Sequence, residues 1–100
     1  MRSIKMALTV PGSKQKGTLF QSELLDNVPI YLIKQDQYYN RKHIYGEPGA
    51  DYPDNVERFS FFCRAVLETA KKLDFRPDII HCNDWHAGLI PVYLKFDSWF

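Results

Sequence analysis

The sequence predicts an open α/β fold in which strands of a parallel sheet alternate with helices. The short apolar runs 28–33 and 78–82 are typical of strands buried on both faces. Between them, segment 54–73 has the apolar period of a helix packed on a sheet. The order strand, long loop, helix, strand, helix therefore indicates a right-handed β-α-β unit.

The amino-terminal third is expected to contribute strands. Segments 1–10 and 17–25 alternate loosely about the turn cluster 11–14, which predicts two antiparallel strands. The run 28–33 is rich in β-branched and apolar residues and predicts a further strand. Residues 34–53 hold prolines, glycines and tyrosines without a sustained period, so we expect a long irregular segment, and such loops are often functional.

The first long helix should begin at Asp54. Asp54 and Glu57 have the spacing of a capping box, in which side chains satisfy the free amides of a helix start. The apolar stripe expected to face the sheet recurs at three- and four-residue steps and comprises Val56, Phe59, Phe62, Cys63, Val66, Leu67, Ala70 and Leu73. Proline at position 77 disfavours helix in the residue before it and ends the helix.

A second helix is expected from about Trp85 to Lys95, after the strand 78–82. Asn83 and Asp84 can cap its start. Pro91 removes a backbone donor, so a kink is predicted near position 88.

Length and composition exclude several classes of protein. One hundred residues make one domain at most, or part of one. Hydrophobic residues at 45% and charged residues at 25% exclude a disordered or low-complexity chain. A net charge of +1 indicates neither nucleic acid nor an anionic membrane as partner. Neither a long apolar leader segment nor a membrane-span run is present, and Cys63 and Cys82 are expected to be reduced, buried thiols of a soluble protein.

The richest chemical cluster is the run 81–86, which follows a predicted strand and begins a predicted helix. In open α/β sheets ligands bind at this edge. The side chains of His81, Asn83 and Asp84 are suited to hydrogen-bonding a sugar, and a helix amino terminus offers amides to phosphate. The structural alternative is that Asp84 only caps the helix, Trp85 fills the core and one histidine satisfies backbone carbonyls.

The sequence offers two other candidate sites. A metal could be held by His81, Asp84 and His86, but their spacing is not that of a zinc helix motif, and we predict no metal. The long loop offers rings that could stack on sugar faces, or merely cover the sheet, with polar neighbours: Tyr38, Tyr39, Arg41, His43, Tyr45, Tyr52 and Asp54. Walker, G-x-G-x-x-G and G-x-S-x-G motifs are absent from the sequence.

The chain resembles the bacterial and plant glycogen and starch synthases. The most specific segment is the run 77–95, PDIIHCNDWHAGLIPVYLK. Supporting segments occur in the right order, namely 28–33, Tyr45-Gly46, the run 51–55 and Arg58-Phe59. Together they cover roughly residues 20 to 95.

The resemblance implies part of the amino-terminal, Rossmann-like parallel-sheet domain of a GT-B glycosyltransferase. Such enzymes transfer glucose from ADP-glucose, or sometimes UDP-glucose, to the non-reducing end of an α-1,4-glucan, with retention and without an essential metal or cofactor. The family resemblance also implies a cytoplasmic protein in a bacterium, or a stromal one in a plastid. The expected partners are the glucan acceptor and ADP-glucose, with no nucleic acid and no membrane.

Site residues follow from the same resemblance. We expect His81, Asn83 and Asp84 to be catalytic residues that hold glucose hydroxyls. We expect the substrate-binding residues to line the cleft or orient the loop and helix edge beside the acceptor, and they are Tyr52, Asp54, Asn55, Arg58, Trp85 and His86. Many bacterial members have histidine where this chain has Asn83.

Two features of the family are missing from the 100 residues. They are the glycine-rich Lys-x-Gly-Gly loop and the carboxy-terminal domain that binds the nucleotide. We therefore expect a fragment that is inactive alone. The alternatives are a non-catalytic glucan- or partner-binding remnant and, from another class, a metal-dependent hydrolase.

Overall fold

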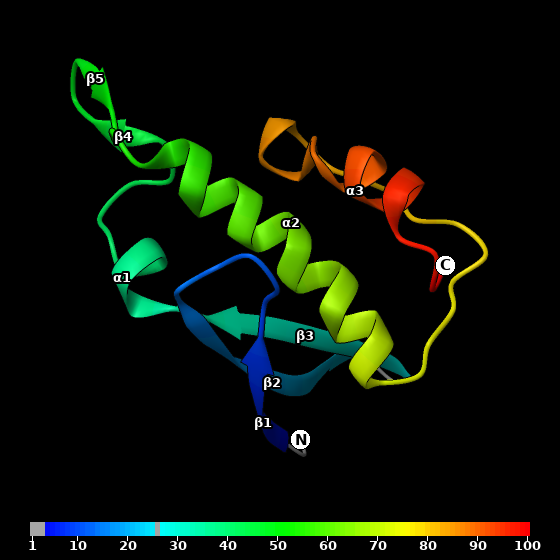
Figure 1. The fold of residues 1–100 in the computed structure, drawn as a ribbon. Coiled ribbons are helices and arrows are strands. Elements are labelled where there is room, and N and C mark those ends of the chain that lie inside the picture. Colours follow the sequence, from blue (N-terminus) through cyan, green and yellow to red (C-terminus); the bar gives the residue numbers. More distant parts are fainter. Residues whose placement is uncertain (1–3, 26) are drawn as a thin grey trace.

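Three strands at the amino terminus form an antiparallel sheet in chain order (Figure 1). The computed structural model describes residues 4–25 and 27–100. Strands β1 (Ile4–Thr9), β2 (Lys16–Leu25) and β3 (Val28–Lys34) are paired so that Thr9 lies opposite Lys16 and Thr18 opposite Lys34. The turn between β1 and β2 lies where the cluster 11–14 predicted it, which confirms the antiparallel pair.

Strand β3 forms where it was predicted, but its surroundings differ. It pairs with β2 in antiparallel fashion, and in the described part of the chain its other edge has no partner. Leu32 is 57% exposed and Val28 is 49% exposed. The prediction of a parallel strand buried on both faces is therefore wrong for the described residues, because β3 pairs only with antiparallel β2 and most of its side chains stay exposed to solvent.

The long loop contains three short elements. Helix α1 (Asp36–Tyr39) is capped by Gln35, whose side chain accepts from the backbone amide of Tyr38 at 3.0 Å. Strands β4 (Gly46–Glu47) and β5 (Ala50–Asp51) form a small hairpin that projects beyond the start of the next helix (Figure 1).

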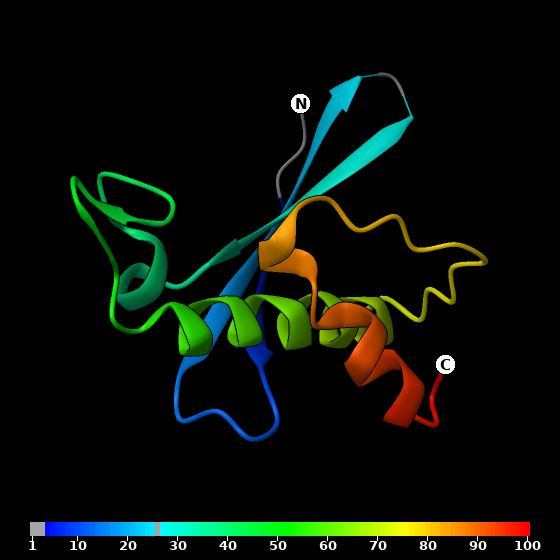
Figure 2. The same ribbon diagram turned by 90° about the horizontal axis from the view of Figure 1, so that it is seen from above.

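Helix α2 (Asn55–Lys72) is the centre of the fold and lies between the sheet and the carboxy-terminal elements (Figures 1 and 2). Its start at Asp54 is confirmed. The capping role of the Asp54 side chain is wrong, since this carboxylate makes no cap hydrogen bond and instead accepts from Arg41.

Burial along α2 follows two faces rather than the single predicted stripe. On the sheet side, Phe61 and Ala65 pack with Leu8 and Val10 of the β1 region. On the other side, a second cluster consists of Cys63, Leu67, Ala87 and Ile90. Val56 was expected in the core and is 76% exposed. Because the helix is covered from two sides, its burial departs from the amphipathic pattern of a surface helix.

The chain after α2 runs through an irregular segment, 73–84, that swings outward and returns (Figure 2). The predicted strand 78–82 does not form, and Ile79 is 85% exposed. A strand needs a hydrogen-bonded neighbour, and no neighbouring strand is present for this run in the described chain.

The helix predicted from about Trp85 to Lys95 is divided into two elements near the predicted kink at position 88, and its α-helical part begins only at Ile90. A 3-10 turn, η1 (Trp85–Ala87), precedes helix α3 (Ile90–Phe96), and Pro91 lies in the first turn of α3, where its missing amide costs nothing. An ion pair between Lys71 Nζ and Asp97 Oδ2, 2.6 Å apart, links the end of α2 to the end of α3. Among the described helices, none has the length and apolar character needed to span a bilayer.

Candidate functional site

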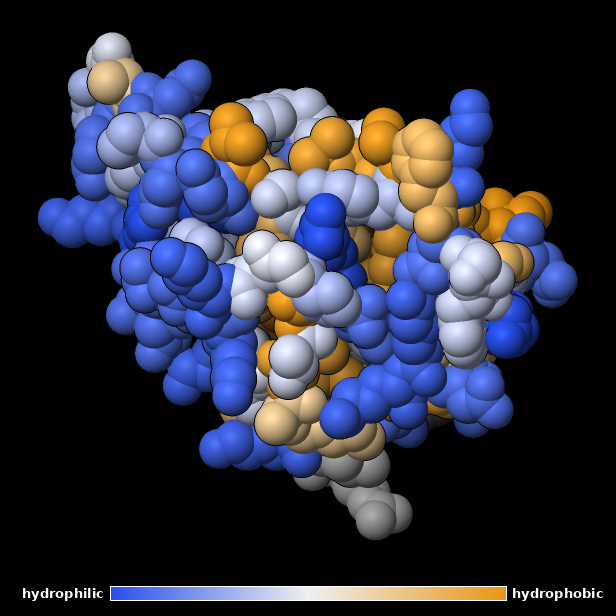
Figure 3. All heavy atoms as spheres, viewed as in Figure 1, coloured by the Kyte–Doolittle hydropathy of each residue, from blue (hydrophilic) through white to orange (hydrophobic). Residues whose placement is uncertain are grey.

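The run 81–86 lies on the loop that leads into η1. The side chains of His81, Asn83, Asp84 and Trp85 are exposed and His86 is half-buried. Within residues 4–25 and 27–100, no hydrogen bond to the His81 or Asn83 side chain is found, so both side chains are open to a ligand. Figure 3 shows hydrophobic residues along the edge of the molecule where η1 and α3 lie. Trp85 of η1 is 55% exposed and Val92 of α3 is 48% exposed.

Asp84 adopts a backbone conformation that side chains rarely take. Its φ of 66° and ψ of 173° lie in a region that is essentially restricted to glycine and costs about 1–3 kcal/mol for other residues. Its carboxylate accepts from the Trp85 amide at 2.6 Å and from the Tyr45 hydroxyl at 2.9 Å. These two hydrogen bonds, the backbone one first, hold the pKa of Asp84 below its usual value. Asp84 is thus an ionised cap of η1, as the sequence predicted.

An aromatic cluster, made of Tyr45, Phe59 and Trp85, surrounds this cap. The rings of Tyr45 and Trp85 stack with centroids 5.1 Å apart and an interplanar angle of 21°. Phe59 meets Trp85 edge to face at 4.7 Å. His86 lies beside them, 5.8 Å from Phe59, and its buried Nδ1 has no hydrogen-bond partner among the described residues. The cluster leaves Trp85 half exposed and available for stacking on a ring.

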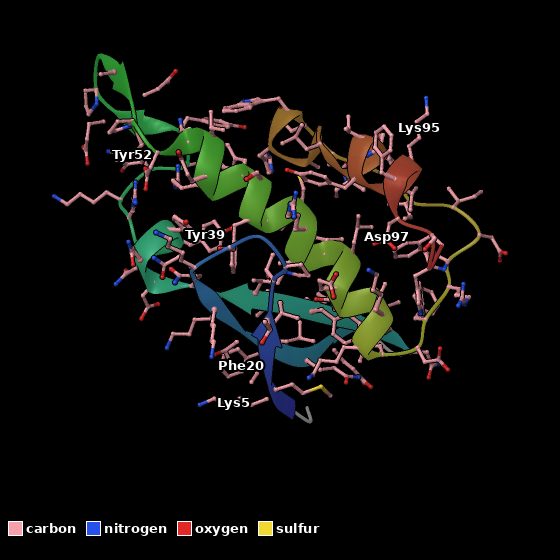
Figure 4. The ribbon with its side chains drawn as sticks, viewed as in Figure 1. Lys5, Phe20, Tyr39, Tyr52, Lys95 and Asp97 are labelled. Carbon is pink, nitrogen blue, oxygen red and sulfur yellow. The ribbon has the colours of Figure 1, made fainter. Side chains whose placement is uncertain are left out.

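The other predicted site residues gather at the start of α2. Asp54 receives both terminal nitrogens of Arg41, each at 2.6 Å, and this ion pair holds the pKa of Asp54 below its usual value. The Tyr52 ring lies 4.9 Å from the guanidinium carbons of both Arg41 and Arg58. Figure 4 shows Tyr52 at this end of the helix.

Arg58 and Asn55 connect α2 to the long loop. Arg58 is 3% exposed, and its guanidinium donates to the backbone oxygens of Tyr38 (2.7 Å) and Ile44 (2.8 Å) and to Oδ1 of Asn55 (2.6 Å). Asn55 donates to the Tyr45 carbonyl at 2.7 Å. The structure therefore brings together the two groups of predicted residues, 52–58 and 81–86.

The link between these groups is Tyr45, which the sequence indicated as a ring of the loop and as part of a segment shared with the family, without a role of its own. Arg41, the partner of Asp54, also appeared there without an individual role. Spacing along the chain cannot identify either residue, because Tyr45 and Asp84 are 39 positions apart. The available signal was the concentration of tyrosines in one loop, which also holds Arg41.

An apolar cavity of about 1290 Å³ adjoins the cluster. Its walls come from β3, the loop 39–48, one side of α2 and residues 75–80, and His86 and Tyr45 are among its lining residues. It is larger than the pockets of about 300–1,000 Å³ that hold small ligands. In the described part of the chain, no group of three histidine, cysteine or acidic side chains is arranged to hold a metal ion.

This mixed α/β segment thus presents exposed polar groups beside an aromatic cluster, a combination that is able to hydrogen-bond a polar ligand and to stack on a ring. Comparison with known families is more specific, since the family described as starch synthase catalytic domain matches residues 1–99. The chain belongs to this family.

Curated relatives agree with this assignment. The chain is 47% identical over 91 residues to a protein named Glycogen synthase 2 from Geobacter sulfurreducens, covering 91% of this chain and 19% of that protein. It is 51% identical over 86 residues to Glycogen synthase 2 from Geobacter metallireducens, with coverage of 86% and 18%. A Glycogen synthase from Photobacterium profundum is 54% identical over 69 residues, with coverage of 69% and 14%. The chain thus spans less than a fifth of the length of these relatives, and no solved structure matches it.

Proposed function

We propose that these residues form part of the catalytic domain of a glucosyltransferase of the glycogen and starch synthase type. The reaction is transfer of glucose from ADP-glucose to the non-reducing end of an α-1,4-glucan, with retention and with no resident metal or cofactor. The observation that supports it best is the match of a starch synthase catalytic domain to residues 1–99. The bacterial relatives favour a cytoplasmic location over a plastid one.

In this proposal the exposed groups beside η1 hold the sugar. His81 and Asn83 offer a ring nitrogen and an amide to glucose hydroxyls, while Asp84 fixes the loop that bears them. Transfer requires the acceptor hydroxyl and the departing diphosphate to be held in fixed positions relative to the transferred glucose. Rigid positioning groups provide this geometry. Trp85 and His86 form the wall beside the sugar.

We also propose a more specific fold assignment, in which these residues belong to the Rossmann-like domain of a GT-B enzyme. It is supported by the free edge of β3 and by the run 78–82, which has a strand sequence but no strand partner. Both line the apolar cavity. A further strand placed between them would pair with each, cover Leu32 and Ile79, and give residues 78–82 a reason to become extended.

The proposed activity is tested with a chimera. The 91 matched residues of the Geobacter sulfurreducens protein are replaced by their counterparts from this chain, and glucose incorporation from ADP-glucose into glycogen is measured. We expect an active chimera, and no activity from residues 1–100 alone.

Substitutions in the chimera test the site. His81→Ala and Asn83→Ala should each lower kcat by about 10²-fold, the scale of one lost positioning contact. Asn40→Ala, the same substitution at an exposed residue of the loop, is the matched control and should leave kcat unchanged. A chimera that is folded by circular dichroism and inactive would refute the proposal. In that case, binding of maltooligosaccharides by residues 1–100 would favour the glucan-binding alternative.

A further inference from the structure

The backbone around Tyr45 is held by three hydrogen bonds to two successive carbonyl oxygens. Its carbonyl accepts from the Asn55 side chain at 2.7 Å and from the Tyr52 amide at 2.9 Å. The preceding carbonyl, that of Ile44, accepts from Arg58 at 2.8 Å. Two of these three donors are side chains from the first turn of α2, so a rigid helix fixes this part of the loop.

Arg58 and Asn55 act as one unit. Asn55 uses Oδ1 to accept from Arg58 at 2.6 Å and Nδ2 to donate to the loop. Arg58 is 3% exposed, and its Nε is also occupied, by the Tyr38 carbonyl. The Nε and Nη1 donors of this buried guanidinium are thus committed to protein oxygens, which ties Arg58 to the loop although its side chain also borders the apolar cavity. These contacts favour a role for Arg58 in holding the loop.

The side chain of Tyr45 passes this restraint to the candidate site. Its hydroxyl donates to Asp84 at 2.9 Å, and its ring stacks on Trp85 at 5.1 Å. Asp84 needs such support, because its backbone is in the glycine region and tends to relax when released. Asn83, the residue before it, would move with any relaxation.

We propose that Asn55 and Arg58 are positioning residues that act through Tyr45 to fix residues 83–85. Neither touches the substrate. Side chains in the first turn of α2 hold the loop backbone, and the Tyr45 side chain on that loop in turn holds Asp84, the cap of η1. The kinetic part of this inference rests on the proposed function, whereas the geometric part does not.

The geometric test uses residues 1–100 carrying Trp99→Phe, which leaves Trp85 as the one tryptophan of the chain. The near-ultraviolet circular dichroism spectrum of the Tyr45→Ala variant is subtracted from that of this protein. The difference is the signal of the stacked Tyr45–Trp85 pair. Asn55→Asp removes the donor to Tyr45 and keeps an acceptor for Arg58. We expect it to raise the population of the detached loop about fivefold, equivalent to one hydrogen bond of about 1 kcal/mol, and to reduce the pair signal.

The decisive comparison is between the effects of the same substitution in the protein with Tyr45 and in the Tyr45→Ala protein. In the Tyr45→Ala protein, Asn55→Asp and Arg58→Lys should change the near-ultraviolet signal no further, because the residue through which they act is gone. Equal changes with and without Tyr45 would overturn the proposal. Far-ultraviolet circular dichroism checks that each variant is folded, and Arg58→Lys, which keeps the charge, provides a second variant if Asn55→Asp unfolds.

Kinetics in the chimera separate positioning from binding. Positioning predicts that Asn55→Asp lowers kcat by up to about fivefold with little change in KM for ADP-glucose or glycogen, and that this effect vanishes in the Tyr45→Ala background. A rise in KM that persists without Tyr45 would show direct substrate contact and overturn the proposal. If the chimera is inactive, the proposed function fails, and the spectroscopic comparison alone decides the positioning role.

Discussion

Replacing Phe61 with alanine should destabilise the protein more than any change on its surface. The ring is 2% exposed and packs with Leu8, Val10 and Ala65, which joins α2 to the β1 region. Removing a buried ring forfeits about 1.5–3 kcal/mol of transfer free energy. The cavity left behind brings the expected loss to about 3–5 kcal/mol. This is a large part of the ~5–15 kcal/mol that stabilises a typical domain.

Urea unfolding followed by far-ultraviolet circular dichroism measures the loss. Phe96→Ala is the matched control, because the same substitution is made at a ring that is 80% exposed, and its cost should be within about 0.5 kcal/mol. Phe61→Leu keeps most of the volume and should cost less than about 1.5 kcal/mol. Equal, small losses for Phe61→Ala and Phe96→Ala would refute the packing of α2 against the sheet.

Three further predictions concern the hairpin, the carboxy terminus and the thiols. Gly46→Ala should disrupt the β4–β5 hairpin, because an added Cβ would clash with the backbone oxygen of Ala50 in β5, and hydrogen exchange of the hairpin amides should accelerate while the core stays protected. Lys71 holds the pKa of Asp97 below its usual 3.8, so the stabilisation is present above pH 3.8 and is lost as pH falls through the lowered folded pKa. The urea midpoints of wild type and Asp97→Asn should therefore differ at neutral pH and converge in acid. Burial raises the pKa of the Cys63 thiol, so iodoacetamide should modify half-buried Cys82 first, and equal rates in the native state would contradict the packing.

Local signals in the sequence predicted the elements whose structure depends on near neighbours. The turn cluster 11–14 correctly placed the first antiparallel pair, and Asp54 correctly marked the start of α2. Pro91 predicted the interruption between η1 and α3. In each case the deciding interaction lies within a few residues along the chain.

Predictions failed where distant segments decide the outcome. Val56 fits the helical stripe, yet it lies beyond both core clusters and is exposed. Residues 78–82 have the composition of a strand, but a strand forms only beside another one, and the described chain offers none there. Arg58 is charged and would ordinarily be placed at the surface, but loop carbonyls satisfy it in the interior.

The candidate site shows the same division. The sequence identified Asp84 as a cap of the following turn, which depends on the adjacent Trp85 amide. It did not identify the Tyr45–Asp84 hydrogen bond, because that contact joins residues far apart in the chain. Figure 4 likewise shows Tyr39 beneath α2, where its hydroxyl donates to the Arg58 carbonyl at 2.8 Å, another contact without a local signal.

The β1–β2–β3 meander pairs only segments that follow one another along the chain. Closing such pairs costs little loop entropy, so they form fast, and a domain made from the amino terminus onward can gain structure while it is still being synthesised. The three-stranded sheet would then be folded before α2 is synthesised and packs on it. The unpaired edge of β3 is exposed during that interval. Rapid packing of later segments against it would prevent strands of different nascent chains from pairing there.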